Sequence, residues 1–337
     1  MTTTGLTLGK YAPLHRGHQY VFDTALAECD ELVVLIYDTT VTPIPLSVRA
    51  RWIRTLYPQV TVIEAWDGPE GYSNERAFEI VQEQYILKML AGRNITHFYS
   101  SEFYGDHVSK ALGAIDRRLD EKRATVPISA TMIRENPWQY RPFLADVVYR
   151  DLITKVVFVG AMSTGKSTIT EALAKKYETS FAPEYGREYW TQHQIDRRIS
   201  FTAFDEIAVG HQEREEAALL QANRYLFVDT NAITTYQYAL DYHGKAPQLL
   251  TQLALENAQR YDLFFLCDTD IPYDDTWDRS GDQKRQVFQK QIIADLKERR
   301  IPYLTLSGSL EARMAGVESV LERFVPYGNF FGETLSV

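Results

Sequence analysis

The first chemically suggestive motif is Gly-Lys-Tyr-Ala-Pro-Leu-His-Arg-Gly-His at residues 9–18, directly after an apolar run. His15 and His18 are three positions apart at an expected helix start, so both can face one point beyond the preceding strand. Gly17 lets a phosphate approach the backbone, and a helix N-terminus favours an anion. With Lys10, these residues suit nucleotidyl transfer, in which a phosphate oxygen attacks a nucleoside triphosphate and pyrophosphate leaves.

A second motif, Ile-Ser-Ala-Thr-Met-Ile-Arg at residues 128–134, places two hydroxyls and an arginine at another expected helix start. Ser129 can cap that helix or, with Thr131, bind a phosphate. Arg134 is placed to reach a triphosphate. An isolated His-x-x-His pair is more often incidental, but the two motifs together predict a phosphate site in the first half of the chain.

A third motif, Gly-Ala-Met-Ser-Thr-Gly-Lys-Ser at residues 160–167, matches the P-loop pattern at every fixed position. Backbone N–H groups of such a loop cradle phosphates, Lys166 reaches the β- and γ-oxygens, and the Ser167 hydroxyl coordinates Mg²⁺. The sequence therefore predicts a site for ATP and Mg²⁺. Its expected nucleotide-binding residues are Gly160, Ser163, Thr164, Gly165, Lys166, Ser167 and Thr168.

Polar residues after the P-loop are typical of a small-molecule kinase. Asp229 ends an apolar strand, where an acid can hold Mg²⁺ or orient the acceptor hydroxyl, and Asn231 follows it. Glu184, Tyr185 and Arg187 mix acid, ring and cation, which suits a ribose joined to an aromatic ring. The catalytic base is left open between Asp229 and Glu184. The alternative for residues 184–187 is a salt-bridged helix start.

Two further segments are expected to contact nucleotide. Residues 277–285 are basic, contain glycine and include Arg279, so they predict a lid that closes over phosphates. A solvated loop is the alternative. Gly308, after the last expected strand, is placed to line an adenine pocket.

The elements that must position these residues alternate between strand and helix. Apolar runs recur in both halves, and stretches with helical spacing separate them, as in βαβ units of a parallel sheet. The predicted fold class is α/β with two doubly wound parallel-sheet domains, a Rossmann-like nucleotidyltransferase and a P-loop kinase. We expect the nucleotidyltransferase domain to cover residues 1–150 and the nucleoside kinase domain to cover residues 151–337.

Composition excludes several other classes. The 337 residues carry 36 Lys and Arg against 45 Asp and Glu, a net charge of −9, and 45% are hydrophobic. These are ordinary globular values, without the basic surface of a nucleic-acid-binding protein. No apolar run approaches the roughly 20 residues of a membrane span, and no secretory signal is visible. Two cysteines far apart in the chain fit reduced thiols and a cytoplasmic location.

The first two motifs resemble the signatures of the nucleotidyltransferase superfamily, which includes the nicotinamide-mononucleotide and pantetheine-phosphate adenylyltransferases. This resemblance implies that His15 and His18 contact the ATP phosphates, that Lys10 holds the reacting phosphates, and that Arg134 contacts the departing pyrophosphate. It also implies roles for residues outside the core of the motifs: Gly9, Gly17, Ser129 and Thr131 at the nucleotide, Asp38 at the substrate, and Tyr104 in the segment 100–105 that would hold adenosine.

The two halves together resemble the NadR-type bifunctional enzymes of NAD salvage, including their Pro-Glu-Tyr-x-Arg-Glu and Asp-Thr-Asn elements. The resemblance implies a C-terminal domain that phosphorylates nicotinamide riboside to nicotinamide mononucleotide (NMN) and an N-terminal domain that converts NMN and ATP to NAD. Asn231 departs from the pattern, because an Asp is common there. The chain begins almost at its first strand, so we expect no helix-turn-helix module and no DNA binding.

Two alternatives of different kinds stay open. The first is a fusion of pantetheine-phosphate adenylyltransferase with dephospho-coenzyme-A kinase, which has the same order of folds. The second is a nucleotide-sensing regulator with one silent domain, with a functional link to a vitamin transporter. The sequence also leaves open a homo-oligomer.

Overall fold

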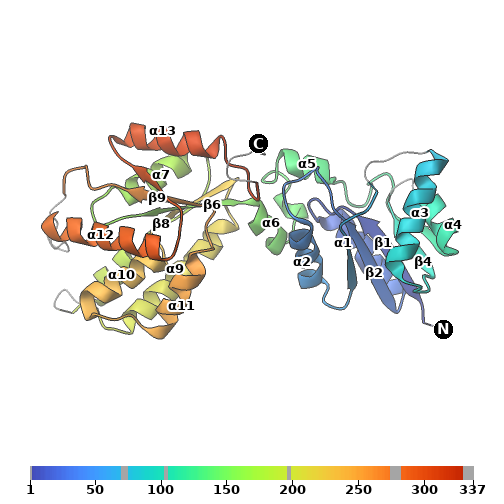
Figure 1. The fold of residues 1–337 in the computed structure, drawn as a ribbon, viewed down its shortest axis with the longest axis horizontal. Helices are drawn as coiled ribbons and strands as arrows, with labels where there is room; N and C mark the ends of the chain where they lie inside the picture. The colour runs from blue at the N-terminus through green and yellow to red at the C-terminus, as the bar shows by residue number, and fades with distance from the viewer. Residues whose placement is uncertain (1, 70–74, 102–104, 196–198, 274–281, 329–337) are drawn as a thin grey trace, which may run out of the picture. The chain divides into compact units, whose positions relative to one another are not determined.

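A computed structural model of the chain describes residues 2–69, 75–101, 105–195, 199–273 and 282–328. The chain divides into two compact units, with Met1–Tyr149 forming the body of the first and Arg150–Phe324 forming the second. Each unit is built around its own sheet (Figure 1). In the described part of the chain, no helix combines the length and the apolar character that crossing a bilayer requires.

The sheet of the first unit has five parallel strands in the order β3-β2-β1-β4-β5. The strands are β1 (Thr4–Gly9), β2 (Glu31–Tyr37), β3 (Thr61–Ala65), β4 (His97–Ser100) and β5 (Ile115–Arg118). The helices are α1 (Arg16–Glu28), α2 (Leu46–Leu56), α3 (Arg76–Leu90), α4 (Gly105–Leu112) and α5 (Ala130–Glu135), with a 3₁₀ turn at Arg141–Phe143. Helix α6 (Asp146–Leu152) spans the boundary between the units.

Helices cover both faces of this sheet. In Figure 1, α1 and α2 lie on one side and α3 and α4 on the other. Buried side chains of α3 and α4, such as Ile86, Leu90 and Val108, pack with Leu6 and Phe98 of the strands. β1 is the central strand, with β2 on one side and β4 on the other, so its carboxyl end lies where the strand order reverses. That edge of a doubly wound sheet is where ligands bind.

The second unit repeats this architecture with the strand order β10-β9-β6-β8-β7, again all parallel. The strands are β6 (Thr154–Val159), β7 (Phe181–Ala182), β8 (Tyr225–Asp229), β9 (Leu263–Cys267) and β10 (Leu304–Leu306). The helices are α7 (Lys166–Lys176), α8 (Tyr185–His193), α9 (Ala203–Leu219), α10 (Ala232–His243), α11 (Gln248–Asn257), α12 (Asp282–Glu298) and α13 (Leu310–Leu321). The predicted fold class is confirmed.

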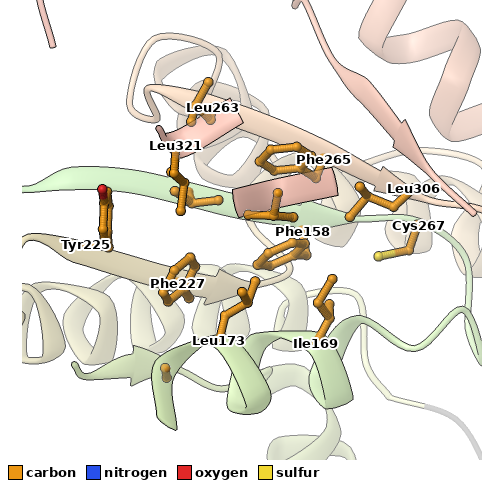
Figure 2. Packing of buried hydrophobic residues seen from close by; sticks show 13 residues of the cluster. Phe158, Ile169, Leu173, Tyr225, Phe227, Leu263, Phe265, Cys267, Leu306 and Leu321 are labelled. Carbon is orange, nitrogen blue, oxygen red and sulfur yellow. The ribbon is translucent and has the colours of Figure 1, made fainter. Parts of the chain in front are cut away.

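A hydrophobic core of the second unit lies between its central strands and helices α7 and α13. Phe158 of β6 stacks near Phe265 of β9 and Phe227 of β8, with ring centroids 5.8 and 6.3 Å away. Figure 2 shows these rings with Ile169 and Leu173 of α7 beneath them. All five side chains are fully buried. Burial of this kind anchors the start of α7, and therefore the loop that precedes it, against the sheet.

Candidate active sites

The first candidate site is a cavity of about 330 Å³ at the carboxyl end of β1. Its walls come from the β1–α1 connection, the loop after β5 and the start of α5. The predicted residues that line it are Gly9, Lys10, His15, Gly17, His18, Ser129, Thr131 and Arg134. The fold thus brings together two motifs that are more than a hundred residues apart in the sequence.

The two histidines form a reciprocal cap at the start of α1. The Gly17 N–H donates to Nδ1 of His15 at 3.1 Å, and the His15 N–H donates to Nδ1 of His18 at 3.3 Å. Their rings stack with centroids 3.8 Å apart. Since each Nδ1 accepts a hydrogen bond, each neutral imidazole carries its proton on Nε2. A Cβ at Gly17 would lie 2.9 Å from the His15 ring, so any other residue there would displace that ring.

Burial keeps both imidazoles neutral. It lowers the pKa of His15 to about 4, with a further contribution from the positive charge of Arg123. Burial also lowers the pKa of His18 well below its ordinary value, as do His15 and Arg123. At neutral pH the pair therefore acts through N–H dipoles and not through net charge.

The positive charge of this site comes from other side chains. Arg134 donates to the Ala12 carbonyl at 2.6 Å and to the Thr131 hydroxyl at 3.0 Å, which joins α5 to the β1–α1 connection. Burial lowers the pKa of Lys10, and so do the nearby charges of Arg134 and Arg49. The Ser129 hydroxyl accepts the Met132 N–H at 3.2 Å, so it caps α5.

Sequence reasoning missed two arginines in this unit. Arg123 lines the cavity beside the histidines, and Arg49 is fully buried beneath the ends of β1 and β2. Asp38 accepts a hydrogen bond from Arg49 at 3.3 Å. The signal for Arg49 was helical spacing, because Leu46 and Ile53, three before and four after it, are both buried. The predicted residue Tyr104 lies outside the described residues.

The second candidate site begins with the P-loop between β6 and α7. Gly160, Ser163 and Gly165 have φ angles of +142°, +55° and +81°, which turn the loop around the space before α7. A side chain at Gly160 would lie 2.8 Å from the Cys267 carbonyl, so this strand end tolerates only glycine. Lys166 is buried and donates to the Ala161 carbonyl at 2.9 Å.

Three buried side chains outside the motif hold the loop from behind, and sequence reasoning missed two of them. The Ala161 N–H donates to Oε1 of Gln289 at 2.8 Å, and Arg313 donates to the Thr164 carbonyl at 2.6 Å. Arg285 donates to the Ser163 carbonyl at 3.3 Å. Arg285 was expected in the lid, but here its guanidinium joins one carbonyl of the P-loop to the carbonyls of Thr269 and Ile271 after β9. The Ala161 N–H is thus already paired with Gln289, while the two arginines bind carbonyl oxygens of the loop and take none of its N–H groups.

One further predicted nucleotide residue, Gly308, lies at the margin of this arrangement. Gly308 has a φ of +86° and its carbonyl accepts a hydrogen bond from Arg313 at 3.0 Å, so it is tied to the same support as the P-loop. Arg279 lies outside the described residues, as does most of the expected lid.

Asp229 lies at the end of β8 and is almost fully buried. Burial, and after it the nearby carboxylate of Glu184, raises the pKa of its carboxyl to about 6. Lys166 and a hydrogen bond from Ser167 act in the opposite direction. Among the described residues, no group of three or more His, Cys, Asp or Glu could hold a metal ion. A metal here would take ligands from nucleotide and water, as Mg²⁺ ordinarily does.

A second cavity, of about 170 Å³, opens beside Lys166 and Glu184. It has aromatic walls and a charged rim. Its other lining residues include Arg187, Trp190, Phe204, His211, Thr230, Tyr238, Asp241 and Tyr242. Glu184 and Arg187 form an ion pair at 3.2 Å at the start of α8, as the expectation of a salt-bridged helix start has it. Both also line the cavity, and their contact with an acceptor stays a prediction.

Two predicted acceptor residues have other contacts. The Tyr185 ring lies under the Arg214 guanidinium at 3.6 Å and against Gly210. Asn231 accepts the Thr234 N–H at 3.2 Å and caps α10. His211 was missed. Its Nε2 donates to the Thr230 carbonyl at 3.2 Å, and burial lowers its pKa. A single histidine in a helix carries no local signal that separates it from an ordinary core residue.

Both units of the chain are similar to known proteins. Residues 6–136 match the family described as cytidylyltransferase-like, and residues 155–313 match the family described as AAA domain. The trifunctional NAD biosynthesis/regulator protein NadR of Escherichia coli is 29% identical over 325 residues, 90% of this chain and 78% of that protein. The chain is a homologue of NadR. The NadR of Salmonella typhimurium is also 29% identical, over 323 residues, 89% of this chain and 78% of that protein.

Solved NadR structures share the fold of both units. A NadR protein in complex with NAD and AMP-PNP aligns with a TM-score of 0.59 at 22% identity, covering 100% of this chain and 98% of that chain. A NadR complex with NR aligns with a TM-score of 0.58, also at 22% identity, covering 100% and 99%. The two-sheet architecture is therefore the NadR architecture.

Proposed function

We propose that this protein is an ATP-dependent transferase of NAD salvage with two activities. The second unit phosphorylates nicotinamide riboside to NMN with ATP. The first unit then adenylylates NMN with ATP, which gives NAD and pyrophosphate. One observation carries the proposal. The chain holds a His-x-x-His helix start and an arginine that line the first cavity, and a P-loop beside the aromatic and acidic second cavity.

The first cavity supports adenylyl transfer because it supplies positioning and charge without a nucleophile. Two Nε2–H groups can donate to ATP phosphate oxygens, while Lys10 and Arg134 neutralise charge as pyrophosphate departs. The NMN phosphate oxygen attacks the α-phosphorus and the bond to pyrophosphate breaks. Ser129, Thr131 and Asp38 are proposed to complete the phosphate and substrate contacts.

The second cavity supports phosphoryl transfer to a riboside. The P-loop geometry fits a triphosphate, since glycine is required at Gly160 and Lys166 stands at the loop. Ser167 and Asp229 would hold Mg²⁺, which supplies charge neutralisation at the transferred phosphoryl group. Aromatic rings and carboxylates of the adjoining cavity suit the cationic ring and the hydroxyls of nicotinamide riboside. Asp229 or Glu184 is proposed as the group that accepts the hydroxyl proton.

The test is product formation by the wild-type chain and two variants, followed by liquid chromatography. With ATP and Mg²⁺, the wild type should convert both nicotinamide riboside and NMN to NAD. Lys166→Ala should form NAD from NMN only, and His18→Ala should stop at NMN. Loss of both activities in either variant would reject the two-site proposal, and absence of any product from wild type would reject the function.

We propose a cytoplasmic location, which both free, buried cysteines support. NAD, ATP, NMN and nicotinamide riboside are the proposed small-molecule partners. The homo-oligomer and the functional link to a vitamin transporter stay predictions.

A further inference from the structure

Arg49 occupies an unusual place for an arginine in the first unit. It lies on α2 with no exposed surface. Its Nη1 donates to the Tyr37 carbonyl at 3.0 Å and also to the Lys10 carbonyl, while Nε donates to the Ile44 carbonyl at 3.1 Å. Nη2 donates to the Asp38 carboxylate at 3.3 Å. One side chain thus joins the carboxyl ends of β1 and β2 to the loop between β2 and α2.

These contacts are costly to make and hard to replace. A buried guanidinium loses its hydration, and its counter-ion Asp38 is itself half exposed, so the ion pair alone compensates poorly. The carbonyl oxygens complete the compensation because they take up the donors that water would otherwise satisfy. Lysine has a point-like ammonium and lacks the planar fork that reaches separate acceptors at once. The arrangement therefore requires arginine.

The partners of Arg49 border the proposed adenylyl-transfer site. Lys10 lines the cavity directly, and the loop held at Asp38 and Ile44 carries Val41, which also lines it. Arg49 itself does not line the cavity. The positive charge of Arg49 nevertheless acts on the site, because it helps to lower the pKa of Lys10, after burial and Arg134.

We propose that Arg49 is a positioning residue for adenylyl transfer, which fixes the Lys10 backbone and the loop of residues 38–44 on one wall of the site. The inference rests on the function proposed for the first unit. Arg49 touches no reacting atom in this account. It acts by holding the phosphate-binding lysine and the adjoining loop at a constant separation, which a reaction catalysed mainly by positioning requires.

The test compares Arg49→Lys and Arg49→Met with the control Arg54→Met. Arg54 lies on the same helix, but it is half exposed and pairs at 2.7 Å with Glu64 of β3, away from the cavity. The full-length chain is used for each. The measurements are kcat and KM for NAD formation from NMN, riboside phosphorylation as an internal control, thermal unfolding, and amide hydrogen exchange of the wild type and every variant.

We expect Arg49→Lys to lower kcat/KM for NMN by about 10- to 100-fold per folded molecule. Exchange should accelerate in residues 10–12 and 37–45 but not in β3, and riboside phosphorylation should stay within about twofold of wild type. Arg54→Met should match wild type. If Arg49→Met does not fold, Arg49→Lys still decides the question.

The inference is overturned if Arg49→Lys retains wild-type kcat/KM once its folded fraction is counted, or if exchange in the two segments is unchanged. It is also overturned if the control variant loses as much activity as Arg49→Lys. Failure of the wild type to make NAD from NMN is a separate result. That result removes the proposed function, while hydrogen exchange still reports whether Arg49 orders the two segments.

Discussion

His15 and His18 show how a short motif can set its own protonation. Each Nδ1 accepts a backbone N–H, and burial disfavours the imidazolium. We therefore predict that both rings are neutral at pH 7 and protonated on Nε2 only. Nitrogen-15 NMR of histidine-labelled protein distinguishes the three protonation states directly. An imidazolium signal at pH 7, or a proton on Nδ1, from either residue would contradict the proposed hydrogen bonds to phosphate.

The raised pKa of Asp229 predicts how the rate of riboside phosphorylation falls at acid pH, the acid limb of the pH profile. Burial and Glu184 raise its pKa to about 6, and the carboxylate must be ionised to bind Mg²⁺ or accept a proton. Riboside phosphorylation should therefore fall as pH drops through about 6. Removing the negative neighbour in Glu184→Gln makes ionisation easier, so the limb should move to lower pH. The measurement is kcat/KM from about pH 5 to about pH 8.

A matched control for that experiment is Glu188→Gln. Glu188 is an exposed carboxylate on the same helix, paired with Arg214 at 3.0 Å, and it does not line the acceptor cavity. Its loss should leave the acid limb in place. If Glu184→Gln lowers the rate without moving the limb, then Asp229 is not the group that titrates.

Gly160 of the P-loop must be glycine for two reasons, its backbone conformation and a close backbone neighbour. A pair of variants distinguishes these reasons. Gly160→Ala combines a φ of +142° with a contact of 2.8 Å to the Cys267 carbonyl, whereas Gly244, which ends α10 at φ +68°, has nothing within 4 Å. We predict that Gly160→Ala lowers riboside phosphorylation by at least about 100-fold. Gly244→Ala should lower Tm by about 2–4 °C through strain alone and keep its activity. Equal activity of the two variants would refute the argument.

The elements with fixed spacing were predictable from sequence, and those held together by distant residues were not. The P-loop and the first histidine motif follow apolar strands at known intervals, so their places at β6 and β1 could be read directly. Strand β5 carries no such apolar signal, because Ile115–Arg118 is a short, largely polar edge strand. Gln289 was missed because its contact with the P-loop spans 128 positions, and no local pattern marks such a partner.

The residues of the candidate sites also differ in whether their contacts are local in the sequence or distant. Lys166 and His18 have their neighbours within a few residues, so sequence spacing locates them. Arg49 and His211 act through carbonyls of other elements, and those contacts exist only once the sheet is assembled. Residues that position others are therefore the part of a site that sequence reasoning misses most easily.

Because the two sites lie in separate compact units, the two reactions can take place on different copies of the chain. A small intermediate such as NMN can leave one chain and enter another. We predict that Lys166→Ala and His18→Ala, mixed in equal amounts with ATP, Mg²⁺ and nicotinamide riboside, form NAD although neither does so alone. Chromatography of the mixture provides the measurement. Failure of the mixture, with both single activities intact, would mean that NMN is not released between the two steps.

The strand order has a consequence for synthesis on the ribosome. In each sheet the first strand made occupies the centre: β1 pairs with β2 soon after, but its other partner is β4, where Gly5 pairs with His97. At typical translation rates that partner follows roughly 5–20 s later. Throughout this interval one edge of β1 has no mate in the nascent chain. At β6 both partners, β8 and β9, come late, since Thr154 pairs with Tyr225 and Val156 with Leu263. Each unit therefore passes through a stage in which chaperones would protect an open strand edge.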